Sequence, residues 1–227
     1  ATGVLSVLQP FPRLDRMLQD TAHAAGGRAA TGEVVIVAID DASLQAVGQW
    51  PWRRALHAEV LRRIAAQAPR CIGLDLLLTE QDAAEPQDDA ILADAMRDSG
   101  CVVLPMALQS VGGQPQKELV PVPALAEAAA GIGHAHLSLD QDGVVRSVYL
   151  QEGFEGRPWP HFIRALHEAG EAVRQGGAAS VRRPSLPPPS GPSGPWLRSD
   201  HELIVFTYGD RPFTTVSYVD VLRGNVP

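Results

Sequence analysis

Positive charge is scarce in this sequence, and lysine is almost missing from it. Lysine and arginine together number 19 against 26 acidic residues, which leaves a formal net charge of -7. Lys117 is the single lysine. A broad basic surface for nucleic acid and a polybasic stretch for anionic membranes are therefore both excluded.

Long apolar runs and cysteines are also rare. No stretch reaches the roughly 20 apolar residues that cross a bilayer. The chain has two cysteines, Cys71 and Cys101, too few for a structural zinc site without several other ligands. They could form one disulfide in an oxidising compartment, or they could stay as two buried thiols. We predict them to be near neighbours at the starts of two adjacent parallel strands.

Hydrophobic residues make up 45% of the 227 residues, which is enough for a packed core. In the first half, short apolar runs alternate with amphipathic segments. These runs lack polar alternation, which is typical of strands buried on both faces of a parallel sheet. We predict a β-α-β-α-β core over residues 33–108, with strands at 33–39, 70–78 and 101–108 and helices at 51–68 and 87–100.

The flanking segments have other patterns. An apolar stripe predicts a helix within residues 4–25. The second half predicts a hairpin over 131–153 around the turn "DQDG", followed by a helix at 158–173, a strand at 201–209 and a helix at 216–224. Residues 182–195 are proline-rich and predict an extended loop inserted into one domain. The fold class is therefore α/β: a mostly parallel central sheet flanked by helices, with an antiparallel hairpin in the second half.

Carboxylates follow the first two predicted strands. Asp40 and Asp41 end the first strand, Asp75 lies near the end of the second, and Glu80 comes just after it. Ligands of open parallel sheets bind beyond the carboxyl ends of the strands. We therefore expect Asp40 and Asp75 to share one cleft, with Arg53 pairing with at least one of them.

Two interpretations of these carboxylates compete. In the first, Asp40, Asp41 and Asp75 form the metal site of a hydrolase, although Ala42 breaks the spacing of aspartate-based phosphatases. In the second, Asp40 or Asp41 caps the helical turn "DASLQAVG", and Asp75 is a buried carboxylate paired with an arginine. The second interpretation needs no ligand, and it predicts that replacing Asp75 destabilises the fold.

Aromatic and histidine pairs give weaker signals. Trp50 and Trp52 flank Pro51, and they could stack on a ring-shaped ligand or close the sheet as core residues. His134 and His136 fall on one face of a predicted strand, but no third ligand lies nearby in the sequence, so we predict no metal. The phosphate-binding loop, the dinucleotide fingerprint and the nucleophile elbow are all absent from the sequence.

Several blocks together resemble a known family. They are "VVIVAIDDASLQAVGQWPWRRALHAEVLRRIAAQAPRCIGLDLLLTEQD", "DDAILADAMRDSGCVVLPMAL", "AAAGIGHAHLSLDQDGVVRSVYL" and "VSYVDVLRGNVP", with the lead-in "LDRMLQD" before the first. The sequence resembles the CHASE sensory domain of the second type, found outside the membrane in bacterial cyclases, histidine kinases and related receptors. Such domains usually continue into a further strand and a membrane helix, so we expect this chain to be part of a longer protein.

This resemblance implies a function and a cellular location. It implies an extracytoplasmic (periplasmic) sensor domain of an inner-membrane receptor, with no cofactor and no catalytic residues of its own. The expected partners are a small-molecule or environmental signal, flanking membrane helices, a cytoplasmic kinase or cyclase, and a second copy of the chain. We take Asp40, Asp41, Trp50, Trp52, Arg53, Asp75 and Glu80 as candidate ligand-binding residues. The alternatives are the metal-dependent hydrolase and a protein-interaction domain without a small ligand.

Overall fold

The computed structural model describes residues 21, 27–82, 85–111, 114–140, 142–154, 157–177, 195–207 and 212–225. The predicted helix 4–25, apart from Thr21, and the proline-rich loop 182–195, apart from Pro195, lie outside these residues. The chain divides into two compact units: residues 1–36 with 204–215, and residues 37–203 with 216–227. Every site discussed below belongs to the second unit.

A parallel sheet forms the centre of the second unit. Strand β3 (Val102–Val111) pairs in parallel with β2 (Ile72–Gly73) on one side and with β5 (Gly131–His134) on the other. The far half of β3 also pairs antiparallel with β4 (Gln114–Leu119). The predicted fold class is confirmed, and so is the parallel pairing of the second and third predicted strands.

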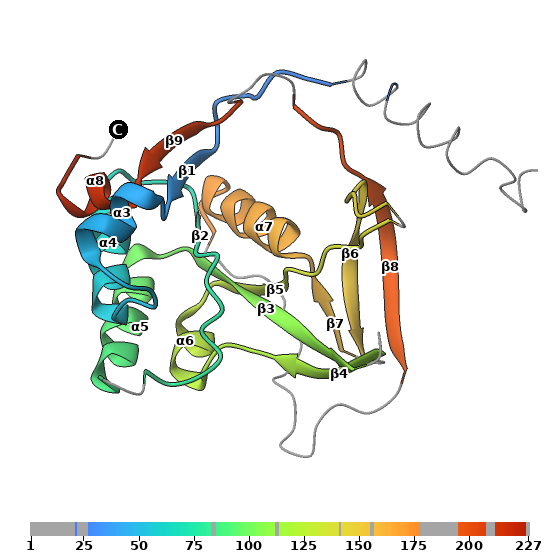
Figure 1. Cartoon of the computed structure of the whole chain (residues 1–227), viewed down its shortest axis with the longest axis horizontal. Coiled ribbons are helices and arrows are strands. Elements are labelled where there is room, and N and C mark those ends of the chain that lie inside the picture. The colour runs from blue at the N-terminus through green and yellow to red at the C-terminus, as the bar shows by residue number, and fades with distance from the viewer. Residues whose placement is uncertain are drawn as a thin grey trace, which may run out of the picture. The chain divides into compact units, whose positions relative to one another are not determined.

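Helices cover both faces of this sheet. Successive side chains of a strand point to opposite faces, and β3 divides its apolar residues in that way. Val102, Leu104 and Met106 pack into one buried cluster with α4 (Arg54–Ala65), α5 (Gln87–Ser99) and α6 (Pro123–Ala128). Val103 packs on the other face against α7 (Phe162–Arg174), which lies across the sheet from α5 and α6 in Figure 1. Burial on both faces explains why this strand has no polar alternation.

Helix α7 approaches β5 closely because of a glycine. A Cβ atom added to Gly133 would lie 2.6 Å from Cα of Phe162, closer than side-chain carbons approach backbone atoms. Ala165 and Ala169 are fully buried on the same face of α7. Small residues therefore let the start of α7 rest directly on β5.

The first predicted strand has a different partner from the one expected. Strand β1 (Val35–Ala38) pairs with β9 (Thr214–Ser217), in a sheet of two strands, and not with β2. Val35 and Ile36 are 49% and 42% exposed. The predicted burial of this run on both faces is therefore wrong, because β9 is the partner of β1 among the described strands.

The predicted hairpin over 131–153 is also wrong in its pairing. Its first run is β5, which pairs with β3. Its second run is β6 (Ser147–Phe154), which lies between β7 (Arg157–Pro160) and β8 (Trp196–Leu203) in an antiparallel sheet. The "DQDG" segment does turn, since Gly143 N–H donates to Asp140 O at 2.9 Å, but it joins two different sheets. The antiparallel hairpin of the second half is β6–β7.

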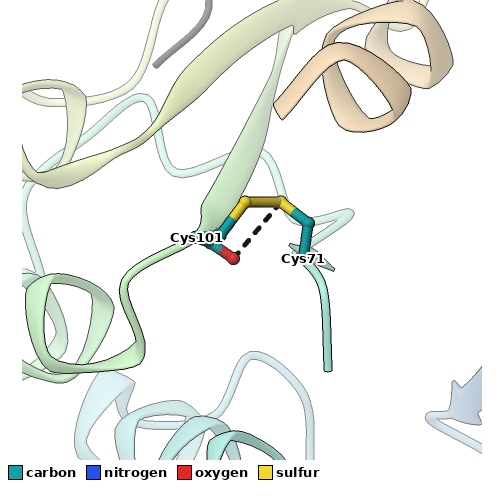
Figure 2. Close-up of a disulfide and its surroundings, with 2 residues drawn as sticks. All are labelled: Cys71 and Cys101. Carbon is teal, nitrogen blue, oxygen red and sulfur yellow. Dashed lines mark hydrogen bonds between the residues drawn. A yellow bond between two sulfur atoms is a disulfide. The ribbon is translucent and has the colours of Figure 1, made fainter. Parts of the chain in front are cut away.

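A disulfide joins the two cysteines at the starts of β2 and β3. The Cα atoms of Cys71 and Cys101 are 4.8 Å apart, and the two sulfur atoms are bonded (Figure 2). The Cys71 sulfur also lies 3.4 Å from the Cys101 carbonyl oxygen. The cystine packs on the same face of the sheet as Val103 and α7. The predicted proximity follows from the parallel register, in which Ile72 lies beside Val102.

Candidate functional site

Asp40 caps a helix and ties two distant segments together. Its Oδ1 accepts hydrogen bonds from Ser43 N at 2.9 Å, Ser43 Oγ at 2.6 Å and Ser217 Oγ at 2.9 Å. The hydrogen bonds from Ser43 lower the pKa of Asp40, and the one from Ser217 adds to this effect. Asp40 is the N-cap of α3 (Asp41–Val47), and Asp41 is an exposed residue of its first turn. The helix-cap interpretation therefore describes Asp40.

Arg53 pairs with a residue that the sequence analysis did not select. Its Nε and Nη2 donate to the two carboxylate oxygens of Asp88 at 3.1 and 3.2 Å. Asp88 is fully buried and also accepts the Ala55 N–H at 3.3 Å, so it serves the first turn of α4 as well. The predicted pairing of Arg53 with Asp40 or Asp75 is wrong, because the start of α5 packs against the start of α4.

Arg54 forms a second ion pair between the same two helices. It donates to Asp89 of α5 and to the backbone oxygen of Glu80. Arg54 is 9% exposed and Asp89 is 7% exposed, so this pair lies in the packed interior between α4 and α5. Four charged side chains thus fix one helix against the other. The Arg53 side chain is nevertheless 56% exposed, and ligand binding by Arg53 stays a prediction.

Asp75 and Glu80 lie in exposed positions after β2. Strand β2 ends at Gly73, so Asp75 has left the sheet. No described residue forms a hydrogen bond or an ion pair with the Asp75 side chain. The predicted burial of Asp75 is wrong, and the strand order removes the reason to expect it beside Asp40, because β1 and β2 belong to different sheets. Ligand binding by these carboxylates stays a prediction.

Replacing Asp75 with alanine is now expected to change the free energy of unfolding by no more than about 0.5 kcal/mol, as exposed positions without partners usually do. Chemical denaturation of the variant beside the unaltered chain measures this directly. A loss of several kcal/mol would show that Asp75 has a buried partner after all.

The two tryptophans have unequal environments. A cis peptide bond joins Trp50 to Pro51. Trp52 is 7% exposed, donates its Nε1–H to Gly48 O at 2.9 Å, and packs 5.0 Å from the Tyr218 ring. Trp50 is 41% exposed and rests its ring 5.4 Å from Trp52 and 5.7 Å from His57. Trp52 is therefore a core residue, whereas stacking of a ligand on Trp50 stays a prediction.

His57 is buried beneath these rings. Its Nδ1 lies 2.9 Å from the hydroxyl of Tyr218, in helix α8 (Tyr218–Leu222). Burial lowers the pKa of His57 to about 4, and the charge of Arg54 acts in the same direction. Burial also raises the pKa of Tyr218. The neutral ring and the protonated hydroxyl then share one hydrogen bond, which stabilises the contact between α4 and α8.

Acid is expected to weaken the fold through His57. A pKa of about 4 in the folded chain, against an ordinary 6.5, means that the unfolded chain takes up the proton first. The full stability is therefore present above pH 6.5 and is lost as the pH falls toward 4. We expect His57→Gln to remove about 2 kcal/mol of the stability difference between pH 7 and pH 5. Urea unfolding at the two pH values measures it, with the exposed His167→Gln as control. Equal pH dependence in all three proteins would contradict the prediction.

Three histidines and a glutamate meet where the two larger sheets join. Glu152 of β6 is 1% exposed and accepts from His136 Nδ1 at 2.8 Å through Oε2. Arg198 of β8 places its Nε 3.5 Å from the same oxygen. His134, the last residue of β5, is fully buried, and its ring centre lies 4.9 Å from that of His161, the N-cap of α7. We call these five residues the histidine junction.

Several polar atoms of the histidine junction have no hydrogen-bond partner among the described residues. These atoms are Nε2 of His161 and Oε1 of Glu152, together with the ring nitrogens of His134, to which the Tyr149 backbone is at most a weak partner that raises the pKa of His134. Buried polar atoms of this kind are uncommon, because leaving them unpaired typically reduces stability by about 1–3 kcal/mol each. The sequence analysis found His134 and His136 but missed Glu152, His161 and Arg198. Each of those comes from another strand or from a helix start, so only the fold brings them together.

Burial dominates the electrostatics of the histidine junction. It lowers the pKa of His134 to about 4 against the opposing charge of Glu152. It also lowers the pKa of His161. Burial alone would raise the pKa of Glu152, but the hydrogen bond and charge of His136, with the charges of His134 and Arg198, leave that pKa lowered. At neutral pH the junction therefore holds an ionised glutamate and two neutral buried rings.

The chain belongs to the CHASE2 domain family, whose family model matches residues 1–227, the whole chain. This family consists of extracellular sensory domains and not of enzymes. No curated protein and no solved structure matches the chain. Within the part of the chain that the structure describes, no helix is both long and apolar enough to span a bilayer. Nor do three or more metal-binding side chains of the described residues come together to hold a metal ion.

Proposed function

We propose that this domain senses a signal on the outer side of a bacterial inner membrane and relays it to a cytoplasmic kinase or cyclase. Membership of the CHASE2 family over the whole chain carries the proposal. The Cys71–Cys101 disulfide supports it, because such bonds persist in oxidising compartments such as the periplasm.

The physical requirement for this relay is modest. A signal shifts the output only by its difference in affinity for two arrangements of the domain. The signal then reaches the cytoplasmic module through membrane helices that flank the domain in the full-length receptor. The hydrolase interpretation gains no support. Asp40 is a helix cap, and Asp75 is an exposed residue that follows β2, a strand of a different sheet from β1.

The relay is tested in the full-length receptor, reconstituted in lipid vesicles, by the activity of its kinase or cyclase module. Asp89→Ala breaks a buried ion pair of the sensor domain, and Asp94→Ala breaks an exposed pair with Arg97 on the same helix. We expect Asp89→Ala to change the output severalfold and Asp94→Ala to leave it unchanged. Kinase or cyclase activity that is unchanged by both substitutions would show that this domain does not control the cytoplasmic module.

A further inference from the structure

The histidine junction connects the main structural parts of the second unit. His134 ends β5 of the parallel sheet, Glu152 and Arg198 come from β6 and β8 of the antiparallel sheet, and His161 begins α7. His134 and His161 also form an isolated backbone bridge. A change of charge at this point therefore acts on both sheets and on the helix that covers the parallel sheet.

We propose that the histidine junction is a proton-binding site and that acidification is the signal this domain detects. The proposal rests on the proposed function and names its ligand. It is carried by geometry: two buried imidazole rings lie beside a buried carboxylate, and within the described residues Nε2 of His161 and Oε1 of Glu152 have no hydrogen-bond partner.

Protonation of these rings changes the balance of charge inside the junction. The charged and titratable groups that act on His134 are Glu152, His161 and His136, and Arg198 acts on Glu152. Strand β3, which packs against β5, has no titratable side chain. Strand β7, which also packs against β5, contributes Arg157, and this residue pairs with Glu118. Glu152 already accepts from His136 and lies beside Arg198, so it can compensate little additional positive charge. Two protonated rings with centres 4.9 Å apart then repel each other.

An arrangement that exposes the rings to water binds these protons more tightly. We call the arrangement in the structure closed and one that exposes the rings to water open. His134 has a pKa of about 4 in the closed arrangement and an ordinary value of 6.5 in water. Going from pH 7 to pH 5 therefore shifts the equilibrium toward the open arrangement by about 20-fold from this residue alone. Because the start of α7 rests on Gly133 without intervening side-chain atoms, opening at His134 and His161 displaces α7 from β5.

Amide hydrogen exchange of the 227-residue chain measures this opening. The reporters are the Ala135 N–H, which donates to Met106 O, and the His161 N–H, which donates to Leu150 O. We expect their protection factors to fall by at least about 20-fold between pH 7 and pH 5 with EDTA present, after correction for intrinsic exchange, because His161 adds to the contribution of His134. The N–H of Ala129, the C-cap of α6, donates to Leu125 O. We expect this group to keep its protection, which would exclude global unfolding.

Substitutions assign the protons to residues. His134→Gln and His161→Gln each remove one titrating ring, and we expect each to reduce the pH-dependent loss of protection several-fold. If one variant does not fold, the other still tests whether the junction histidines bind the protons. The exposed His167→Gln should behave as the unaltered chain does. Protection that does not change with pH would overturn the proposal, as would a response abolished by His57→Gln and retained in both junction variants.

The output of the full-length receptor then separates the two proposals. We expect kinase or cyclase activity to change between external pH 7 and pH 5, and His161→Gln to reduce this change. Output that ignores pH but responds to Asp89→Ala would overturn proton sensing and leave the relay intact. Output that responds to neither would overturn the relay itself.

Discussion

Replacing Asp89 with alanine is expected to lower the free energy of unfolding by about 3–5 kcal/mol, the usual result of removing one partner from a buried ion pair. Asp89 binds Arg54 where α5 packs on α4, and both residues are almost inaccessible to solvent. Without Asp89, the guanidinium keeps one backbone acceptor, Glu80 O, and the charge of Asp82, but it loses the carboxylate with which it forms its buried ion pair. Burial already lowers the pKa of Arg54, which shows how unfavourable this environment is for a cation.

Asp94→Ala is the matched control, since Asp94 lies on the same helix in an exposed pair with Arg97. Exposed pairs of this kind contribute about 0–1 kcal/mol, so urea unfolding should separate the two variants clearly. Similar midpoints for Asp89→Ala and Asp94→Ala would mean that the pair between α4 and α5 contributes no more than a surface contact.

Removing the disulfide by Cys71→Ala together with Cys101→Ala is expected to lower the free energy of unfolding by roughly 3–4 kcal/mol. The cysteines are 30 residues apart in sequence, and the bond limits the freedom of the unfolded chain over that loop. The bond also fixes the start of β2, which has only two residues in the sheet. We therefore expect the exchange protection of β2 to fall more than that of β3.

Unfolding of the unaltered chain with and without reductant gives an independent check on this value. The reduced chain and the double variant should have similar midpoints, both below that of the oxidised chain. Identical midpoints for the oxidised and reduced chains would contradict a stabilising role for the bond.

Local sequence patterns predicted where helices and strands form better than they predicted which strands pair. Strand β3, α4 and α5 form close to where the sequence placed them, because their apolar periodicity reflects burial on both faces or on one stripe. Strand β1 has the same kind of apolar run as β3, yet its partner is β9, almost 180 residues later in the chain. Periodicity reports that a strand forms, but it carries no information about such a distant neighbour.

The candidate residues show the same contrast between local contacts, which the sequence predicts, and contacts with distant residues, which it does not. The cap formed by Asp40 with Ser43 is local, and the sequence suggested it. The partner of Arg53 is Asp88, which looks like an ordinary acidic residue in the first turn of a helix. Only the packing of α5 against α4 reveals that pair. The histidine junction depends on three strands and a helix start, so two histidines of one short segment were its only visible sign.

The most direct test of an extracytoplasmic sensor domain is its accessibility in living cells. Asp94 is exposed, and no described cysteine is free, so Asp94→Cys adds one reactive thiol to the described part of the domain. The full-length receptor carrying this substitution is treated with a membrane-impermeant maleimide in intact spheroplasts, with the unsubstituted receptor as control. An extracytoplasmic domain predicts labelling of the Asp94→Cys receptor without lysis. Labelling that appears only after the membrane is broken would place the domain in the cytoplasm and contradict its assignment as an external sensor.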